Sequence, residues 1–325
     1  MNGNGRHVSV LRNEIVVALA PSNGETFVDG TFGGGGYTRA LLDAAKCHVY
    51  GIDRDAAAIA RGRALEERYA PRLTLIHGRF SVMASLLGAR GVSAADGIAL
   101  DFGVSSFQFD QPERGFSFRE DGPLDMRMDE SQGETAADLV NTLSESELAD
   151  VLRRYGEEKR AKQIARAIVV ARPITRTGEL AAIVEKVLGK GHAGRIHPAT
   201  RTFQALRIAV NDELGEIDEG LAAAERILTP EGRLAVVSFH SLEDRIVKRF
   251  FAGRSGRAGR GSRHAPDRAE PVAETFELLG KQPQLPLAAE VDANPRARSA
   301  RLRAAKRTTA PAHPFKANAS HGGEA

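Results

Sequence analysis

Cysteine is nearly absent from the sequence: Cys47 is the single one in 325 residues. This excludes an intrachain disulfide framework and a zinc site built from several cysteines. No apolar run approaches the ~20 residues that a membrane-spanning helix needs. Residues 1–12 also lack the apolar stretch of a secretory signal peptide. We therefore expect a cytoplasmic protein with no membrane partner and no bound metal.

Net charge is also small, because 45 Lys and Arg residues face 42 Asp and Glu residues. Residues 251–325 hold 13 of these bases and 7 of the acids, so the rest of the chain, with 32 bases and 35 acids, is mildly acidic. Residues 294–307 contain six bases and no acid. A clustered basic segment indicates a polyanionic partner, and a merely solvated tail is the alternative. Residues 253–268, rich in Gly and Arg, are typical of a mobile loop.

Strand and helix patterns alternate in the first half of the chain. β-branched and apolar runs predict strands at residues 26–29, 47–53, 73–77 and 97–101. Helix patterns lie between them, at residues 38–45 and 55–69. This alternation indicates βαβ units, and therefore an α/β protein with a doubly wound parallel sheet.

A long interruption separates the fourth strand from the next, at residues 234–239, which follows the turn signal Pro230-Glu231-Gly232. The gap of 133 residues after Asp101 far exceeds the dozen or so that a parallel crossover needs. We therefore expect an inserted domain. The predicted division is a sheet domain formed by residues 1–110 and 212–310, an inserted helical domain at 111–211, and a disordered tail at 311–325.

The insertion carries helix signals throughout. Ser144 and Glu147 have the spacing of a capping box, with an apolar face following them. A second apolar face, at residues 180–188, precedes Gly189, which is suited to end a helix. An apolar stripe from Phe203 to Leu221 predicts one continuous helix that begins near Pro198.

A glycine cluster between the first strand and the first helix is the most informative stretch. Glycine permits positive φ and a close approach of backbone to a ligand, and the helix that follows presents unpaired N–H groups. Asp53 ends the second strand, 17 residues after Gly36. A carboxylate at that place can accept hydrogen bonds from both hydroxyls of a ribose. Loop and acid together predict an adenosine site, and a purely structural turn is the alternative.

The motifs narrow the choice of nucleotide that the predicted site can bind. The loop is not the G-x-G-x-x-G of dinucleotide enzymes, and the chain has no G-x-x-x-x-G-K-[ST] phosphate loop. Asp29, just before the glycines, would repel a pyrophosphate but suits a cation such as the ammonium group of S-adenosylmethionine. This charge argument favours methyl transfer over hydride transfer. Asp101-Phe102-Gly103 matches the kinase D-F-G by coincidence, since the other kinase motifs are missing.

Two residues are candidates for catalysis. Asp101 ends the strand that lies beside the first strand in a doubly wound sheet, so its carboxylate can bind a cofactor or accept from an amino group. A turn-capping aspartate is the alternative. His240 ends the strand at 234–239 and precedes a helix, which leaves a substrate role and a structural turn role open.

Ordered motifs along most of the chain resemble a known family. They are HxxVL from His7, DGTFGGGG from Asp29, GIDRD from Gly51, DFGVSS from Asp101, ERGFSF from Glu113, DGPLDMRMD from Asp121, YGEEKRAKQIARAI from Tyr155, HPATRTFQALRIAVNDEL from His197, SFHSLEDRIVKRFF from Ser238 and NPRARSARLR from Asn294. The chain thus resembles the methyltransferase H family of the small ribosomal subunit. These bacterial enzymes methylate N4 of a cytidine in the decoding region of 16S rRNA.

The resemblance implies a class I, Rossmann-like, S-adenosylmethionine-dependent methyltransferase fold with an inserted helical domain. It implies that the cofactor is S-adenosylmethionine, bound by Gly35, Gly36, Tyr37, Asp53, Phe80, Asp101 and Gln108. Tyr37 departs from the pattern, since many relatives have His there, so a side-chain contact is less secure than a backbone contact. Gly34 replaces a bulkier residue, and residues 252–287 match the family poorly.

The expected chemistry is amine methylation. The exocyclic nitrogen of cytosine is a poor nucleophile, and an acceptor for its N–H groups restores nucleophilicity, so Asp101 is the candidate acceptor. The (D/N)-P-P-Y motif of many amino-methyltransferases is absent, and DFGVSS stands in its place. Carbon-5 methylation needs a thiolate, and Cys47 lies at the wrong end of its strand.

The expected partner is the 16S rRNA of the small ribosomal subunit. The target base must be exposed or flipped. Aromatic and arginine side chains near the insertion can form a stacking platform for bases or can pack between domains: Phe107, Phe109, Phe116, Phe118, Arg114, Arg119 and Arg127. An amino-methyltransferase of DNA or of small molecules and a non-catalytic ribosome-assembly factor are the alternatives. The sequence leaves open whether the protein is a homodimer.

Overall fold

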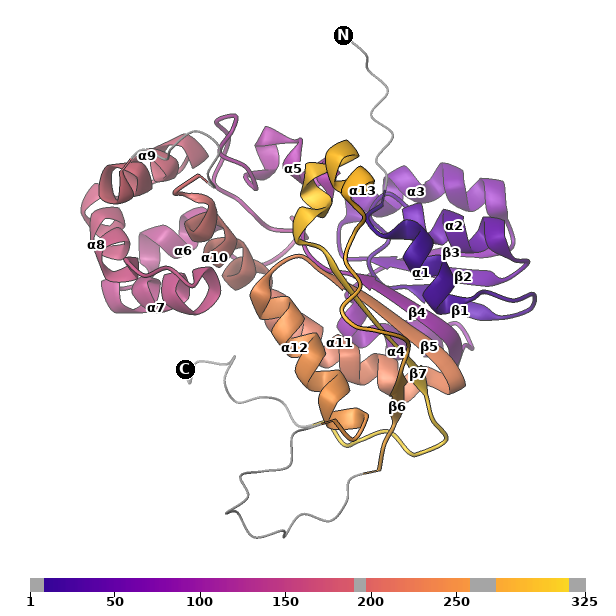
Figure 1. The fold of residues 1–325 in the computed structure, drawn as a ribbon. Coiled ribbons are helices and arrows are strands. Elements are labelled where there is room, and N and C mark those ends of the chain that lie inside the picture. The colour runs from indigo at the N-terminus through magenta and orange to yellow at the C-terminus, as the bar shows by residue number, and fades with distance from the viewer. Residues whose placement is uncertain (1–8, 190–196, 258–272, 316–325) are drawn as a thin grey trace, which may run out of the picture. The chain divides into compact units, whose positions relative to one another are not determined.

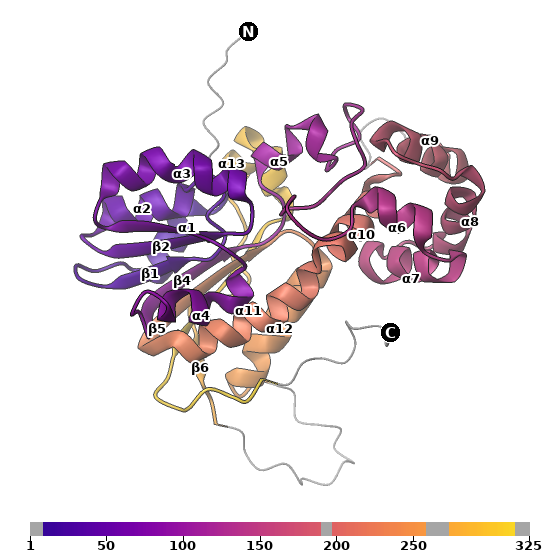
Figure 2. The same ribbon diagram turned by 180° about the vertical axis from the view of Figure 1, so that it is seen from behind.

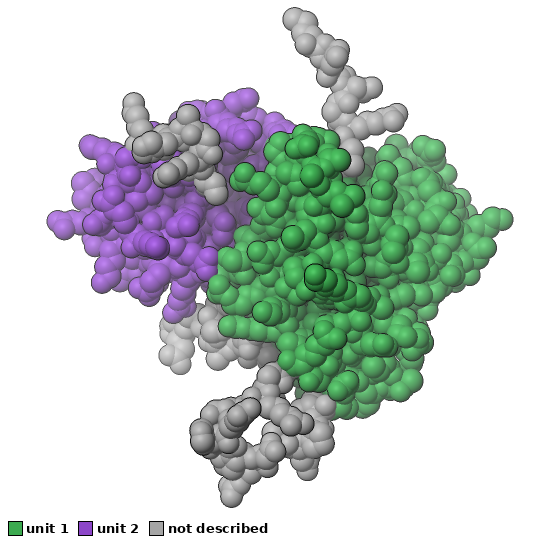
Figure 3. Space-filling model, in the orientation of Figure 1, with its two compact units in different colours: residues 1–103, 214–325 green, residues 104–213 purple. Residues whose placement is uncertain are grey.

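The computed structural model describes residues 9–189, 197–257 and 273–315. The chain divides into two compact units (Figure 3). The sheet unit comprises Met1–Gly103 and Leu214–Ala325, and the helical unit comprises Val104–Glu213. Much of the loop expected at 253–268 and of the tail expected at 311–325 lies outside the described residues. Within the described ranges, no helix is both long and apolar enough to cross a bilayer.

The sheet unit is built on seven strands in the order β3-β2-β1-β4-β5-β7-β6. Their bounds are β1 Thr26–Asp29, β2 His48–Asp53, β3 Leu73–His77, β4 Ala95–Asp101, β5 Leu228–Ser238, β6 Phe276–Leu278 and β7 Arg301–Arg307. The first five strands are parallel, and β7 is antiparallel to both of its neighbours. The predicted class I methyltransferase fold is thus confirmed, with β7 inserted into the otherwise Rossmann-like order.

Helices cover both faces of this sheet (Figures 1 and 2). One face carries α1 Arg12–Leu19, α2 Gly36–Ala44 and α3 Ala56–Tyr69, and the other carries α4 Met83–Gly88, α11 Glu213–Ile227 and α12 Ser241–Arg254. A short helix, α13 (Ala288–Ala293), and two 3-10 turns, η1 (Phe80–Val82) and η3 (Pro295–Ser299), complete the unit.

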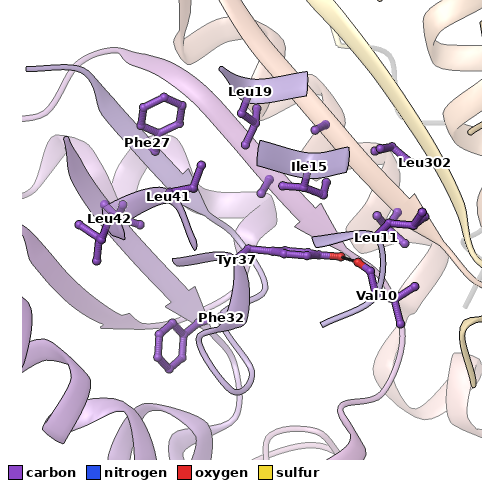
Figure 4. Packing of buried hydrophobic residues seen from close by; sticks show 14 of the residues in the cluster. Val10, Leu11, Ile15, Leu19, Phe27, Phe32, Tyr37, Leu41, Leu42 and Leu302 are labelled. Carbon is purple, nitrogen blue, oxygen red and sulfur yellow. Dashed lines mark hydrogen bonds between the residues drawn. The ribbon is translucent and has the colours of Figure 1, made fainter. Parts of the chain in front are cut away.

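Helical periodicity explains how α1 packs. Leu11, Ile15 and Leu19 are spaced four residues apart, so they share one face, and all three are fully buried. They join a cluster that contains Phe27 of β1 and residues of α2 (Figure 4). Val17 lies on the opposite face and is 78% exposed. Each fully buried side chain of this size contributes about 1.5–3 kcal/mol, which holds α1 against the sheet.

The helical unit contains α5 Ser106–Phe109, a 3-10 turn η2 Pro112–Arg114, α6 Ala136–Thr142, α7 Glu145–Gly156, α8 Ala161–Ala171, α9 Thr177–Leu188 and α10 Thr200–Asn211. The predicted capping box is confirmed, because Ser144 N–H donates to Glu147 Oε2 at 2.8 Å and Glu147 N–H donates to Ser144 Oγ at 3.3 Å. Gly189 ends α9 with a φ of 85°, also as predicted.

The single helix predicted from Phe203 to Leu221 is wrong. The chain forms α10 and α11 instead, because Asp212 between them has a left-handed φ of 47°. The side chain of Asn211 explains why α10 ends there: its amide oxygen accepts from Met128 N–H at 2.8 Å, and its amide nitrogen donates to Met126 O at 2.7 Å. These buried hydrogen bonds fix the last turn of α10. The spacing of apolar residues does not indicate them, so it could not predict where the helix ends.

The predicted start of the strand at 234–239 is also wrong. β5 begins at Leu228, and its pairing with β4 shifts between Ala95 and Gly97. The residues Pro230-Glu231-Gly232 lie within β5, at this irregularity, and Glu231 has a φ of 68°. The turn signal therefore marks a bulge inside a strand.

The basic segment at 294–307 is a part of the sheet and not a solvated tail. Its second half is β7, where Arg303 and Arg307 are buried. Both Arg301 and Arg303 donate to the carboxylate of Asp244 on α12, at 2.8 Å. Arg307 donates to backbone carbonyl oxygens of Glu225 and Thr275. Four of its six bases, Arg301, Arg303, Lys306 and Arg307, thus have partners within the protein, whereas Arg296 and Arg298 are exposed.

The pair formed by Asp244 and Arg303 yields a prediction. Asp244→Ala leaves the buried Arg303 guanidinium without its counter-charge, so we expect a loss of about 3–5 kcal/mol in the free energy of unfolding, measured in urea at pH 7. Partial burial opposes ionisation, but hydrogen bonds from Arg303 and Arg301 lower the pKa of Asp244. Since the folded pKa is depressed, the stabilisation is present above the unfolded pKa of about 3.9 and is lost as pH falls through the folded pKa.

Glu277→Ala is the matched control. Glu277 is 70% exposed and pairs with Lys306 at 3.6 Å, so its removal should cost at most about 1 kcal/mol. Equal losses for the two variants at pH 7 would contradict the assigned role of the buried pair.

Candidate active site

Three carboxylates meet at one edge of the sheet. Asp29, Asp53 and Asp101 end β1, β2 and β4, which are adjacent parallel strands. Because the carboxyl ends of parallel strands share one edge, these side chains lie around the same region. The position predicted for Asp101, on the strand beside β1, is therefore the observed one.

Asp29 is engaged with the backbone that surrounds it. Its carboxylate is 1% exposed and accepts from the N–H of Thr38 at 3.1 Å and from its hydroxyl at 2.7 Å. Burial raises its pKa, although these hydrogen bonds act in the opposite direction. The predicted role of Asp29 as a partner for a cation is thus shared with a structural role that ties β1 to the first turn of α2. Sequence reasoning missed Thr38, which carries no motif of its own.

The glycine loop needs its glycines for two reasons. Gly33 and Gly35 have left-handed φ values of 53° and 70°, which side chains rarely adopt. A Cβ on Gly36 would lie 1.8 Å from Ser9 Oγ. The loop therefore turns tightly before α2 and leaves that helix's first N–H groups near the strand ends.

Asp53 holds this loop from the second strand. Its Oδ2 accepts from Gly33 N–H at 2.7 Å, and its Oδ1 accepts from Asp55 N–H at 2.8 Å. Burial raises the pKa of Asp53 to about 6, against the effect of the two N–H donors. Since an ionised carboxylate offers about four lone-pair sites, each oxygen can still accept one more hydrogen bond.

Asp101 is the least satisfied of the three acids. Its backbone N–H donates to Thr31 Oγ1 at 2.7 Å, which fixes the strand end, and its Oδ1 is buried without a hydrogen bond to any described residue. Burial raises its pKa well above the ordinary value, the charges of Asp29 and Glu243 raise it further, and the Tyr37 phenol opposes them. A buried acceptor of this kind is ready for a donor or a cation.

Tyr37 and Phe80 lie mostly within the core. Tyr37 is 3% exposed, and its hydroxyl donates to the carbonyl oxygen of Val10 (Figure 4). Phe80 is 9% exposed and stacks on Phe102 with ring centroids 5.8 Å apart. A Cβ on Gly220 would lie 2.2 Å from the Phe80 ring. Contacts of Tyr37 and Phe80 with a cofactor stay predictions.

His240 and Gln108 both serve as helix caps. His240 precedes α12, where its Nδ1 accepts from Glu243 N–H at 3.4 Å, and Glu243 in turn accepts from Phe239 N–H at 2.7 Å. Gln108 belongs to the helical unit, and its side-chain oxygen accepts from Ser105 N–H at 3.0 Å. The structural alternative considered for His240 is thus observed, and a catalytic role for it stays a prediction.

The predicted stacking platform consists largely of packed residues. Phe116 belongs to the core of the helical unit, and Phe109 and Phe118 pack against that core. Arg114 is 4% exposed and donates to the carbonyl oxygens of Arg127 and Met128. Packing within the helical unit therefore accounts for Phe109, Phe116, Phe118 and Arg114, whereas Phe107 and Arg119 are exposed and their stacking role stays a prediction.

The chain matches known proteins over nearly its whole length. The model of the MraW methylase family matches residues 4–308. A relative from Paramagnetospirillum magneticum, named ribosomal RNA small subunit methyltransferase H, is 58% identical over 310 residues and covers 94% of this chain and 97% of its own. A relative of the same name from Rhodospirillum centenum is 61% identical over 309 residues and covers 94% of this chain and 93% of its own.

The glycine loop yields a prediction about stability. Gly36→Ala should cost about 1–3 kcal/mol in the free energy of unfolding, because its Cβ collides with the Ser9 side chain. Gly36→Ala combined with Ser9→Gly removes the colliding atoms and should recover most of this loss. Urea unfolding of both single variants and the double variant measures the coupling. Additive effects would show that the collision does not control this position.

Proposed function

Because the chain belongs to the MraW methylase family, we propose that it transfers a methyl group from S-adenosylmethionine to RNA of the small ribosomal subunit in the cytoplasm. The motif resemblance supports a finer assignment, to N4 of a cytidine in the decoding region of 16S rRNA. The relatives' names state the RNA, and the methylated atom is our inference.

The observation that carries this proposal is the set of buried acids at the strand ends. Asp101 Oδ1 is buried without a hydrogen bond to any described residue, and the charges of Asp29 and Glu243 act on it. Excess negative charge in a buried place favours a cationic ligand. S-adenosylmethionine supplies a sulfonium with a transferable methyl group. The residues present therefore fit this cofactor.

Asp53 would hold the ribose. Its two oxygens each use one acceptor site on the backbone of the loop, and the remaining sites suit two vicinal hydroxyls. Gly35 and Gly36 would let the loop approach the cofactor, because neither carries a side chain at the turn into α2.

Asp101 would act on the amine. In the free protein, burial and the charges of Asp29 and Glu243 raise its pKa well above the ordinary value, which disfavours the ionised form. Beside a bound cation the carboxylate form of Asp101 would be favoured, and it would accept an N–H of the cytosine amine and increase electron density on the nitrogen. Asp101 would thus be prepared by the same ligand that completes the site.

The environment of Cys47 supports methylation of the cytosine amine and argues against methylation of carbon 5. It is fully buried, its Sγ lies 3.5 Å from Leu41 O, and burial raises the pKa of its thiol. A thiol of this kind does not supply the thiolate that addition to the ring requires.

Asp53→Ala tests the ribose contact. Two hydrogen bonds to a charged acceptor are worth about 1.5–3 kcal/mol each, so S-adenosylmethionine affinity in calorimetry should fall at least tenfold. Asp292→Ala, which removes an exposed acid on α13, is the control and should bind as the wild type does. Equal affinity for all three proteins would refute the assignment of Asp53.

The raised pKa values predict a pH dependence. Affinity for S-adenosylmethionine should increase as pH rises from 5 to 8, because Asp53 ionises at about 6 and ionised carboxylates bind a cation and hydroxyl groups better. S-adenosylhomocysteine lacks the sulfonium charge, so its affinity should change less over the same range. Identical pH profiles for the two compounds would argue against a charge role for Asp101.

Nucleoside mass spectrometry tests the reaction itself. Small-subunit rRNA from cells that lack the protein should lose N4-methylcytidine, and wild-type protein with S-adenosylmethionine should restore it. Asp101→Asn should slow methyl transfer more than it weakens cofactor binding, because the amide cannot supply the same negative acceptor. Loss of 5-methylcytidine instead would overturn the assigned atom.

A further inference from the structure

The second half of the helical unit carries a block of positive charge that the proposed site does not use. Residues 159–178 contain six bases and no acid: Lys159, Arg160, Lys162, Arg166, Arg172 and Arg176. The block covers α8 and both of its ends. Part of this charge is directed to solvent.

Two of the six bases have internal roles. Arg172 donates to the carbonyl oxygens of Val140 and Leu143, and Arg176 pairs with Asp121. These contacts hold the connections of α8 to the rest of its unit. They take Arg172 and Arg176 out of consideration for a ligand.

The other bases form an exposed strip, which we define as Lys159, Arg160, Lys162 and Arg166. All four are exposed. Lys162 and Arg166 are one helical turn apart, so their side chains emerge on the same side of α8, with Cβ atoms about 6 Å apart. Arg160 bonds the neutral Gln163, and none of the four forms an ion pair with a described acid. Glu157 and Glu158 directly precede the strip, and Glu158 Oε1 accepts from the backbone N–H of Arg160 at 3.0 Å, so the four bases outnumber these two acids and leave a net positive charge.

The apolar side of α8 is already occupied. Ile164, Ala165 and Ile168 are fully buried in the core of the helical unit. A basic amphipathic helix binds a membrane by burying its apolar face in the lipid, and α8 has no such face to offer. The strip therefore suits a partner that is recognised by charge at the protein surface.

We propose that the strip Lys159–Arg166 binds the phosphate backbone of the substrate RNA. The proposal rests on the proposed function, which supplies the RNA as a polyanion. Clustered, exposed Lys and Arg side chains are the electrostatic footprint of such a partner. Phosphate contacts of this kind add affinity without reading bases.

A neutralised triple variant, Lys159→Gln, Lys162→Gln and Arg166→Gln, tests this. Glutamine has good helix propensity, so α8 should persist, and circular dichroism and urea unfolding check that it does. The control variant Lys46→Gln, Arg68→Gln and Arg90→Gln removes three exposed bases of the sheet unit and has the same net charge. The probe is an in-vitro transcript of the decoding region, together with small ribosomal subunits that lack the modification.

We expect the strip variant to bind the transcript at least about tenfold more weakly than the control. The slope of log K against log salt should fall in magnitude by about two, since each lost phosphate contact to single-stranded RNA removes ~0.7. On the ribosomal particle, KM should rise with kcat nearly unchanged, and S-adenosylmethionine affinity should stay as in the wild type.

The outcomes separate the two proposals. If the wild type methylates rRNA and the strip variant matches the control in affinity, salt slope and KM, the strip has no role in RNA binding and the inference is overturned. If the strip variant loses activity on particles but keeps its affinity for the transcript, its partner is a ribosomal protein, which also overturns it. If the wild type neither binds nor methylates rRNA, the proposed function itself fails.

Discussion

The concentration of buried negative charge at the ends of β1, β2 and β4 is the constraint on which the site depends. Asp29, Asp53 and Asp101 are brought together by strand order alone, and burial raises the pKa of each. The fold stabilises two of them with donors from its own backbone, which come from the glycine loop and from α2. The backbone of the loop must therefore pass close to these carboxylates, and glycine permits this close approach.

The third carboxylate has a different environment. Asp101 receives no backbone donor on Oδ1, and the nearby Glu243 adds to its electrostatic cost. A preorganised site stores such a cost in the free protein, and a complementary charge on the ligand offsets it. The same arrangement would thus account for both the binding of a cationic cofactor and the proposed role of Asp101 as an acceptor for an amine. The structure of the site and its proposed chemistry both depend on the negative charge buried at these strand ends.

The positively charged side chains fall into two groups, one with partners inside the protein and one exposed to solvent. Arg303 and Arg307 of β7 are buried, where Asp244 and backbone carbonyl oxygens accept their hydrogen bonds, and these contacts hold the antiparallel strand beside β5. The bases of the strip remain on the surface, because α8 buries its apolar side in the core of the helical unit. The number of bases in a segment of the sequence therefore does not show which of them are available to a partner. That depends on which side chains the fold buries.

The sequence by itself determined the features that depend on neighbours along the chain. Strands β1 and β3, the capping box at Ser144 and the place of Asp53 after the glycines all follow from local patterns, and the structure shows them as predicted. Only the tertiary structure decided that residues 301–307 form a central strand, that Asn211 ends α10, and that Tyr37 is a core residue. Each of these depends on a partner distant in the sequence, and short-range periodicity contains no information about such partners.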